Sequence, residues 1–286
     1  EENDIPFHAL KDVEAGFNLH VLDSQTTRSA TGDTLQTRAE KALDNTWETT
    51  ISTLWIGQYD AATGSRMFSQ YLESVDDEKV VNVKLKQSNN SSAKSHVWFV
   101  ANSGNPEEAG VIAKEEALKK YVLTYSFTDD GLPESQLCGM AGMWEGIVKE
   151  GAMKDLTVNL TRLVAKITFT YAIGGSDFTF TPSSVTLNSV PDKSQIAAPE
   201  KQLTSVTYKR YSGPADNSIT TMCWYLPENM AGTATGDNAV SSEKKKTGKG
   251  MKNATYIELT GEAVQGGVTY QNVTFRFLPG KRSEQL

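Results

Sequence analysis

Alternation of apolar and polar residues at every second position is the clearest pattern along this chain. It is strongest in residues 160–171, where Leu163, Ala165, Ile167, Phe169 and Tyr171 fall on one side and mostly polar residues on the other. A period of two is typical of a β-strand with one buried face. We therefore expect a strand here, with these five side chains facing the core.

Several other segments carry strand patterns of the same kind. Residues 17–22 place Phe17, Leu19 and Val21 on one face. Residues 51–59 are apolar on both faces, which predicts a strand in the middle of a sheet. The last two segments flank Gly266-Gly267 and predict a hairpin. The remaining predicted strands are residues 81–85, 96–101, 178–180, 185–190 and 222–226, and the hairpin comprises residues 254–261 and 268–277.

Helix signals are few. Residues 109–121 form the best helical segment, with Glu115 and Glu116 four residues before Lys119 and Lys120. We expect residues 1–16 to be loose, residues 23–45 to be an exposed loop, and residues 128–151 to be irregular. Regularly spaced strands with little helix predict a mainly all-β protein built from β-sandwiches. We place a domain boundary near residue 155, giving domains of residues 1–155 and 156–286.

Composition and charge argue against some classes of function. The chain has 286 residues, a net charge of −7 and a pI of about 5.2. An acidic chain is a poor match for nucleic acid, which needs a basic surface to neutralise phosphates. No run of 18 apolar residues is present, so no membrane-spanning helix is predicted. Cys138 and Cys223 are far apart, which favours two unpaired thiols; a single disulfide is the alternative in an oxidising compartment.

The candidate catalytic and metal-binding motifs in the sequence are incomplete. His8, His20 and His96 have no spacing that would hold a metal. Gly248-Lys249-Gly250 lacks both the first glycine and the hydroxyl residue of a phosphate-binding loop. No Gly-x-Ser-x-Gly elbow occurs. We therefore predict that the protein is not an enzyme and needs no cofactor. Trp144, in a glycine-rich stretch, is the one tryptophan we consider for stacking on a sugar.

Five short segments, taken in order, resemble fimbrillin-like proteins, the subunits of type V pili. The segment from Leu160 to Ile167 resembles the opening of that family's second domain, and Val100-Ala101-Asn102 resembles the end of a first-domain strand. The others are residues 51–59, the segment Tyr225-Leu226-Pro227-Glu228-Asn229, and residues 254–259. The resemblance spans roughly residues 17–280.

The resemblance implies a fold of two transthyretin-like β-sandwich domains and a role in adhesion at the cell surface. It also implies an outer-membrane lipoprotein precursor, whose lipidated cysteine would lie just before Glu1; no other contact with a membrane is expected. An arginine-specific protease then cuts after the first strand, which leaves and is replaced by a strand of another pilus subunit. Such β-strand addition uses backbone hydrogen bonds for affinity and side-chain pockets for register.

Carried onto this chain, the resemblance implies that residues 17–22 are the removable strand, with Phe17, Leu19 and Val21 as its buried face. Arg28 is the expected processing site because it follows the strand by about six residues. Arg38 is the second choice. The alternative for both is an ordinary solvated arginine in an exposed loop.

Two points stay open. Family members usually continue past the last hairpin and many end in a donor extension, whereas this chain ends at Leu286. A subunit without a donor strand could accept a strand but not give one. The competing hypothesis is a surface glycan-binding lipoprotein with exposed aromatic platforms, so a host or glycan receptor is a further expected partner.

Overall fold

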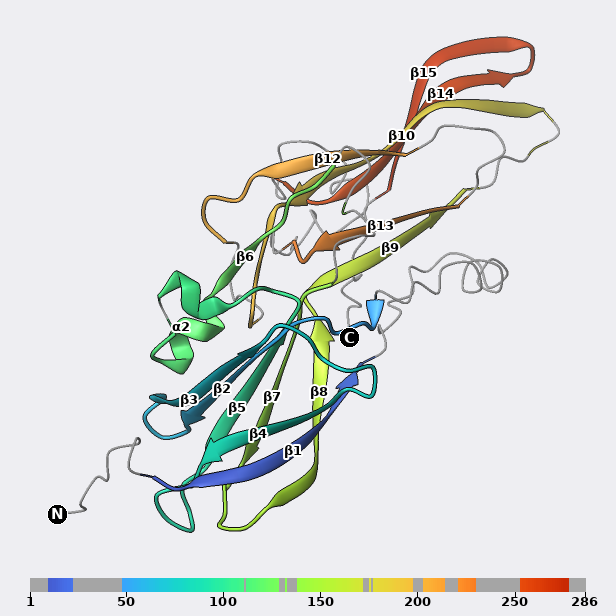
Figure 1. Cartoon of the computed structure of the whole chain (residues 1–286). Coiled ribbons are helices and arrows are strands. Elements are labelled where there is room, and N and C mark those ends of the chain that lie inside the picture. Colours follow the sequence, from blue (N-terminus) through green and yellow to red (C-terminus); the bar gives the residue numbers. More distant parts are fainter. Residues whose placement is uncertain are drawn as a thin grey trace, which may run out of the picture.

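In this computed structural model the described residues are mainly β, as the alternating pattern predicts. They are residues 10–22, 48–110, 112–128, 132, 138–171, 175, 177–197, 203–213, 221–229 and 253–277. The strands form a large sheet in the first half of the chain and two facing sheets in the second half (Figure 1). Strand β8 leads directly from the first part of the molecule toward β9 in the second.

The first part is a seven-stranded sheet in the order β3-β2-β5-β7-β8-β1-β4. Side chains from strands far apart in this order, such as Ile56 of β2 and Val83 of β4, belong to one hydrophobic core. The sheet therefore curls around that core. Its strands are β1 (Asp12–Val21), β2 (Leu54–Asp60), β3 (Arg66–Leu72), β4 (Val80–Lys86), β5 (Ser95–Ala101), β7 (Met140–Gly146) and β8 (Met153–Arg162).

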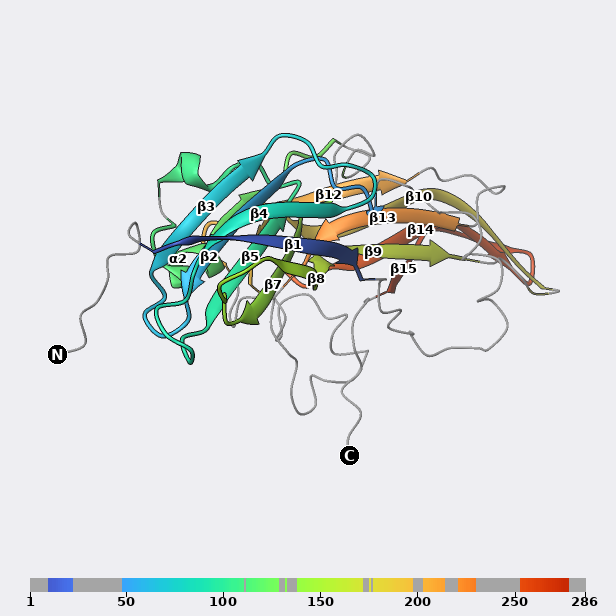
Figure 2. The same cartoon turned by 60° about the horizontal axis from the view of Figure 1, so that its bottom comes forward.

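The second part is a sandwich of a four-stranded sheet, β12-β10-β14-β15, and a two-stranded sheet, β13-β9 (Figure 2). Its separate core joins Phe169 of β9 and Trp224 of β13 to Leu187 of β10 and Leu259 of β14. Strands β6 (Val122–Thr124) and β11 (Lys193–Gln195) form a small sheet of their own. The sandwich strands are β9 (Val164–Thr170), β10 (Phe178–Pro191), β12 (Tyr208–Gly213), β13 (Thr221–Pro227), β14 (Tyr256–Gln265) and β15 (Val268–Phe277).

The strand predicted across residues 160–171 is interrupted at Leu163. There the chain leaves the large sheet, and the Leu163 N–H donates to the carbonyl of Gly139 at 2.8 Å. Past the break the predicted faces are partly wrong, because Val164 is buried and Ala165 exposed, whereas Phe169 and Tyr171 are buried. The domain boundary predicted near residue 155 falls within β8 and stays a prediction.

The single helix expected over residues 109–121 is wrong in extent. A 3₁₀ turn spans Pro106–Ala109 and ends at Gly110, whose φ of +72° suits glycine. Helix α2 covers only Glu115–Lys119. Lys114, which directly precedes α2, is extended and does not continue the helix.

Helix α2 is fastened to the large sheet by the buried carboxylate of Glu115. That carboxylate accepts hydrogen bonds from Trp98 Nε1 at 2.8 Å and His96 Nδ1 at 2.9 Å, and lies 3.3 Å from Lys119 Nζ. Burial acts to raise the pKa of Glu115, but these hydrogen bonds and positive charges outweigh it and hold the pKa below its usual 4.5. His96 Nε2 also contacts Glu145, so both ring nitrogens face carboxylates.

The predicted hairpin near the end of the chain is confirmed as β14 and β15. Gln265 pairs with Val268, and Gly266 and Gly267 supply the positive φ angles of the turn. Strand β15 is an edge of its sheet. Its exposed large apolar side chains are Val268, Tyr270, Phe275 and Phe277, at 39–53%.

Candidate functional site: the first strand and its groove

Strand β1 lies inside the large sheet, between β8 and β4 (Figure 2). It pairs antiparallel with β4 and parallel with β8, and every other described strand pair is antiparallel. A strand that runs parallel to its neighbour cannot reach its place through a short turn. The first strand is therefore set between two strands that come much later in the chain. Residues 12–16, expected to be loose, are part of it.

One face of β1 is an apolar stripe that fills the groove between its neighbours. Val13, Ala15, Phe17 and Leu19 are buried, and Val21 is half-buried. The Phe17 ring contacts Phe99 at 4.8 Å and Trp144 at 5.8 Å between centroids, both edge-on. The half-buried Trp144 thus helps to cover β1.

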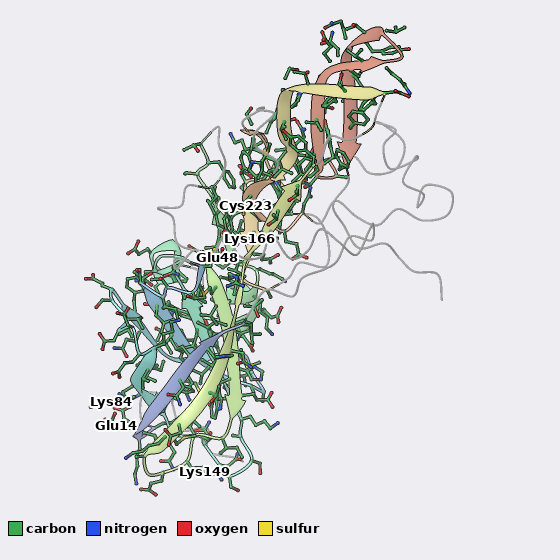
Figure 3. The ribbon with its side chains drawn as sticks, turned by 90° about the vertical axis from the view of Figure 1, so that its right-hand side faces the viewer. Glu14, Glu48, Lys84, Lys149, Lys166 and Cys223 are labelled. Carbon is green, nitrogen blue, oxygen red and sulfur yellow. The ribbon has the colours of Figure 1, made fainter. Side chains whose placement is uncertain are left out.

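The opposite face of β1 carries polar side chains and two ion pairs to β4. Asp12 lies 2.7 Å from Lys86, and Glu14 lies 3.6 Å from Lys84 (Figure 3). Glu14 and Lys84 are both more than 60% exposed, and exposed pairs contribute about 0–1 kcal/mol. Of the two side-chain faces, the apolar one therefore contributes more to the binding of β1.

Burial of three large side chains makes spontaneous loss of β1 slow. Val13, Phe17 and Leu19 together contribute roughly 5–9 kcal/mol, at about 1.5–3 kcal/mol for each buried side chain. That range overlaps the entire stability of about 5–15 kcal/mol of a typical domain. We therefore expect that cutting the chain after β1 would not by itself expel the strand.

Glu48 is the first described residue after residue 22, and an ion pair and hydrogen bonds hold it in place. Glu48 Oε1 lies 2.7 Å from Lys166 Nζ (Figure 3). The same oxygen accepts a hydrogen bond from the Tyr225 hydroxyl, and the backbone carbonyl of Glu48 accepts one from the Arg162 side chain. The Glu48 side chain is only 15% exposed. Lys166 and Tyr225 belong to the second part of the molecule. Glu48 is thus held by contacts that do not involve β1.

Arg28 and Arg38, the predicted processing sites, lie outside the described residues. They fall in the segment between Leu22, which directly follows β1, and Glu48. A cut at either position would leave β1 bound only through non-covalent contacts. Both arginines stay predictions as protease targets.

The two asparagines in the motifs that carry the family resemblance have structural roles. Asn102 has φ +55° and bonds through its side chain to the backbones of Thr50, Ser52 and Cys138. Asn229 donates to the carbonyls of Ser189 and Asn253. Each amide joins segments that are distant in sequence, so these asparagines hold loops in position.

The two cysteines are free, as predicted. Burial raises the pKa of the Cys138 thiol to about 12. Cys223 is half-buried in β13, close to Lys166 (Figure 3). Neither thiol carries the low pKa of a reactive nucleophile.

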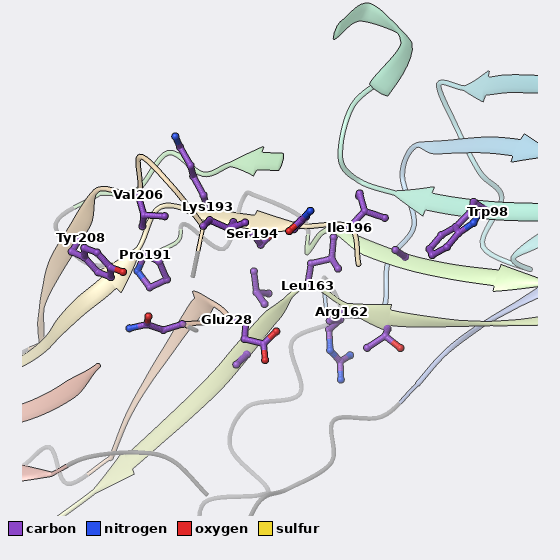
Figure 4. Close-up of a pocket in the computed structure, with 17 residues that line it drawn as sticks. Trp98, Arg162, Leu163, Pro191, Lys193, Ser194, Ile196, Val206, Tyr208 and Glu228 are labelled. Carbon is purple, nitrogen blue, oxygen red and sulfur yellow. The ribbon is translucent and has the colours of Figure 1, made fainter. Parts of the chain in front are cut away.

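A cavity of about 450 Å³ lies where β8 passes into β9 (Figure 4). Its walls include Leu163, Pro191 and Val206, with the charged residues Arg162 and Glu228. It lies apart from the groove of β1. Across the ranges described above, no three His, Cys, Asp or Glu residues gather to hold a metal ion. Those ranges also contain no helix long and apolar enough to cross a membrane.

The fold is that of fimbrial and cell-adhesion proteins of Porphyromonas and Bacteroides. The tip fimbrial protein Mfa3 from Porphyromonas gingivalis, solved with a C-terminal truncation, matches with a TM-score of 0.62 and 14% identity over 95% of this chain and 83% of its own. A putative cell adhesion protein from Bacteroides eggerthii matches with a TM-score of 0.56 and 13% identity over 96% and 81%. The fimbrilin FimA from P. gingivalis gives 0.54 and 12% over 88% and 72%.

Sequence comparison alone is less informative. Residues 224–285 match a family described as a domain of unknown function, DUF4906. A search of curated proteins found no match. The similarity to fimbrial proteins predicted from short motifs is therefore supported at the level of the fold.

Proposed function

We propose that this chain is a structural subunit of a cell-surface pilus that polymerises by protease-triggered strand exchange and supports adhesion. The observation that carries the proposal is the place of β1: an interior strand with a buried apolar face, bordered by two later strands. The fold shared with the tip protein Mfa3 and with FimA supports the same role. Other pilus subunits would be its partners, through β-strand addition.

In the proposed mechanism an arginine-specific protease cuts after Arg28, or after Arg38 as the second choice. Strand β1 then remains in its groove until a strand from another subunit displaces it. The incoming strand needs apolar side chains at alternate positions, with a small one in place of Ala15 and an aromatic one in place of Phe17, because both positions are buried. The contacts of Glu48 with Lys166, Tyr225 and Arg162 do not involve β1 and would remain during the exchange.

The pilus-subunit role also implies a place at the cell surface and a chain of two domains. The precursor would be held in the outer membrane by a lipidated cysteine that precedes Glu1, and the mature subunit would belong to the fimbrium. The two domains, residues 1–155 and 156–286, would each be a transthyretin-like sandwich. A host or glycan receptor would be reached by the assembled pilus.

Substitution of Arg28 tests the processing site. Limited digestion with an arginine-specific protease is expected to cut wild-type protein first after Arg28, because the segment that contains it follows β1 directly. Arg28→Ala should remove this cut, and Arg38→Ala should leave it. N-terminal sequencing of the fragments identifies the cleaved bond.

Arg66→Ala is the matched control, since Arg66 lies in β3 and bonds to Glu107 at 3.0 Å. It should leave the digestion pattern unchanged. First cleavage within one of the described strands, with residues 23–47 intact, would contradict the assignment.

Glycan binding is the second candidate function, favoured by the three exposed aromatic residues of β15. Phe275 and Phe277 each contact a core ring, Phe180 and Phe169 respectively, whereas Tyr270 is 49% exposed. Exposed rings on one edge could stack on a sugar. Titration with soluble oligosaccharides tests this alternative.

A further inference from the structure

Strand β4 depends on β1 for its place in the sheet. It is the outer strand, and its only ladder partner among the described strands is β1, from Asp12 paired with Lys86 to Asn18 paired with Val80. When β1 leaves, β4 loses this entire ladder. A groove with only one ordered wall, β8, would be a poor template for an incoming strand.

A buried glutamine side chain on β2 holds one end of β4 without help from β1. Gln58 is fully buried. Its Oε1 accepts from the Lys86 N–H at 2.7 Å, and its Nε2 donates to the Lys86 carbonyl at 2.8 Å and to Ser95 Oγ at 3.0 Å. The amide thus bonds both backbone groups of one residue, as a neighbouring strand would.

A second contact fastens the chain just past β4. The Ser88 N–H donates to the carbonyl of Val148 at 2.9 Å, and the Val148 N–H donates to Ser88 Oγ at 2.9 Å. At the other end of β4, the carbonyl of Lys79 accepts from the Leu19 N–H of β1. Loss of the N-terminal fragment removes this bond and the bond from the Gln87 N–H to the Lys11 carbonyl. The Lys86 end still keeps its bonds to Gln58 and, through Ser88, to Val148.

We propose that Gln58 is a positioning residue for strand exchange, which keeps β4 in register at the Lys86 end while the groove is empty. This inference rests on the proposed function. An incoming strand would pair first at the attached end, where both walls remain ordered, and then extend toward Val80. Gln58 would thus lower the ordering cost of binding and touch no part of the incoming strand.

The test uses the full chain, nicked with an arginine-specific protease and freed of its N-terminal fragment by gel filtration in moderate urea. After return to buffer, a fluorescent peptide of residues 10–22 is titrated into wild type, Gln58→Met and Tyr59→Phe. Met keeps the length of the side chain but cannot bond the Lys86 backbone. Tyr59→Phe is the matched control, because it removes a buried hydrogen bond to Ile112 from the adjacent residue and leaves β4 untouched.

Gln58→Met should bind the peptide about tenfold more weakly than wild type, the effect of about one net hydrogen bond. Tyr59→Phe should bind it as wild type does, with a similar loss of thermal stability. Hydrogen exchange adds a measurement on wild type alone: without peptide, the Lys86 amide should stay protected when the Val80 end of β4 exchanges.

The outcomes separate the two proposals. Equal peptide affinity for Gln58→Met and wild type, or early exchange of the Lys86 amide, would overturn the role of Gln58 and leave strand exchange standing. If Gln58→Met does not fold, hydrogen exchange of the Lys86 amide in wild type is the measurement that decides the role of Gln58. Failure of wild type itself to bind the peptide would overturn strand exchange, and the role of Gln58 with it.

Discussion

Replacement of Phe17 by alanine is expected to lower the free energy of unfolding by about 3–5 kcal/mol, the usual cost of truncating a buried phenylalanine. Phe17 has no exposed surface and contacts Phe99 and Trp144, so its removal leaves a cavity between β1 and the core. Urea unfolding of the uncut protein measures this loss. In the nicked protein, Phe17→Ala should also speed the release of the N-terminal fragment.

Leu187→Ala provides the control, since Leu187 is fully buried in the other core. It should destabilise the protein by about 2–5 kcal/mol and leave fragment release unchanged. Equal acceleration of release by both variants would mean that β1 is held by the general stability of the chain. That result would contradict the view that the Phe17 pocket retains the strand.

Replacement of Glu115 by alanine should cost about 3 kcal/mol of stability, because it removes a buried carboxylate that accepts two hydrogen bonds and pairs with Lys119. The Trp98 Nε1–H and the His96 ring would lose their acceptor beneath α2. Glu116→Ala is the matched control on the same helix: its side chain is 70% exposed, and its pair with Lys119 should contribute at most about 1 kcal/mol.

The contribution of Glu115 should depend on pH in a defined direction. Its pKa in the folded protein is below the ordinary 4.5. A lowered folded-state pKa means that the contribution is complete above the unfolded-state pKa and is lost as pH falls through the folded value. Urea midpoints of wild type and Glu115→Ala should therefore converge below pH 4.5. A difference that persists unchanged in acid would contradict an ionic role.

Local patterns predicted several elements because their causes are local. Strand β2 is apolar on both faces and lies between β3 and β5, and the Gly266-Gly267 turn joins β14 to β15. The break at Leu163 was missed because apolar alternation continues through it in sequence. It is fixed by the bond of Leu163 to Gly139, which no local pattern reveals.

The candidate site was predictable in part. The apolar stripe of β1 was visible at Phe17, Leu19 and Val21, but its parallel pairing with β8 is a long-range property. The dependence of β4 on β1 follows from that pairing. In the sequence, Gln58 stands out only as a polar residue within the apolar run of residues 51–59. Its partner Lys86 lies in a distant segment, so the contact itself could not be predicted.

The proposed exchange requires that a strand from outside can replace β1 after proteolysis. Uncut and nicked protein, each mixed with a mass-tagged peptide of residues 10–22, can be compared by native mass spectrometry. We expect the nicked chain to lose its own N-terminal fragment and carry the tagged peptide, and the uncut chain to carry none. A nicked chain that keeps its own fragment, or an uncut chain that binds the peptide equally well, would contradict the claim.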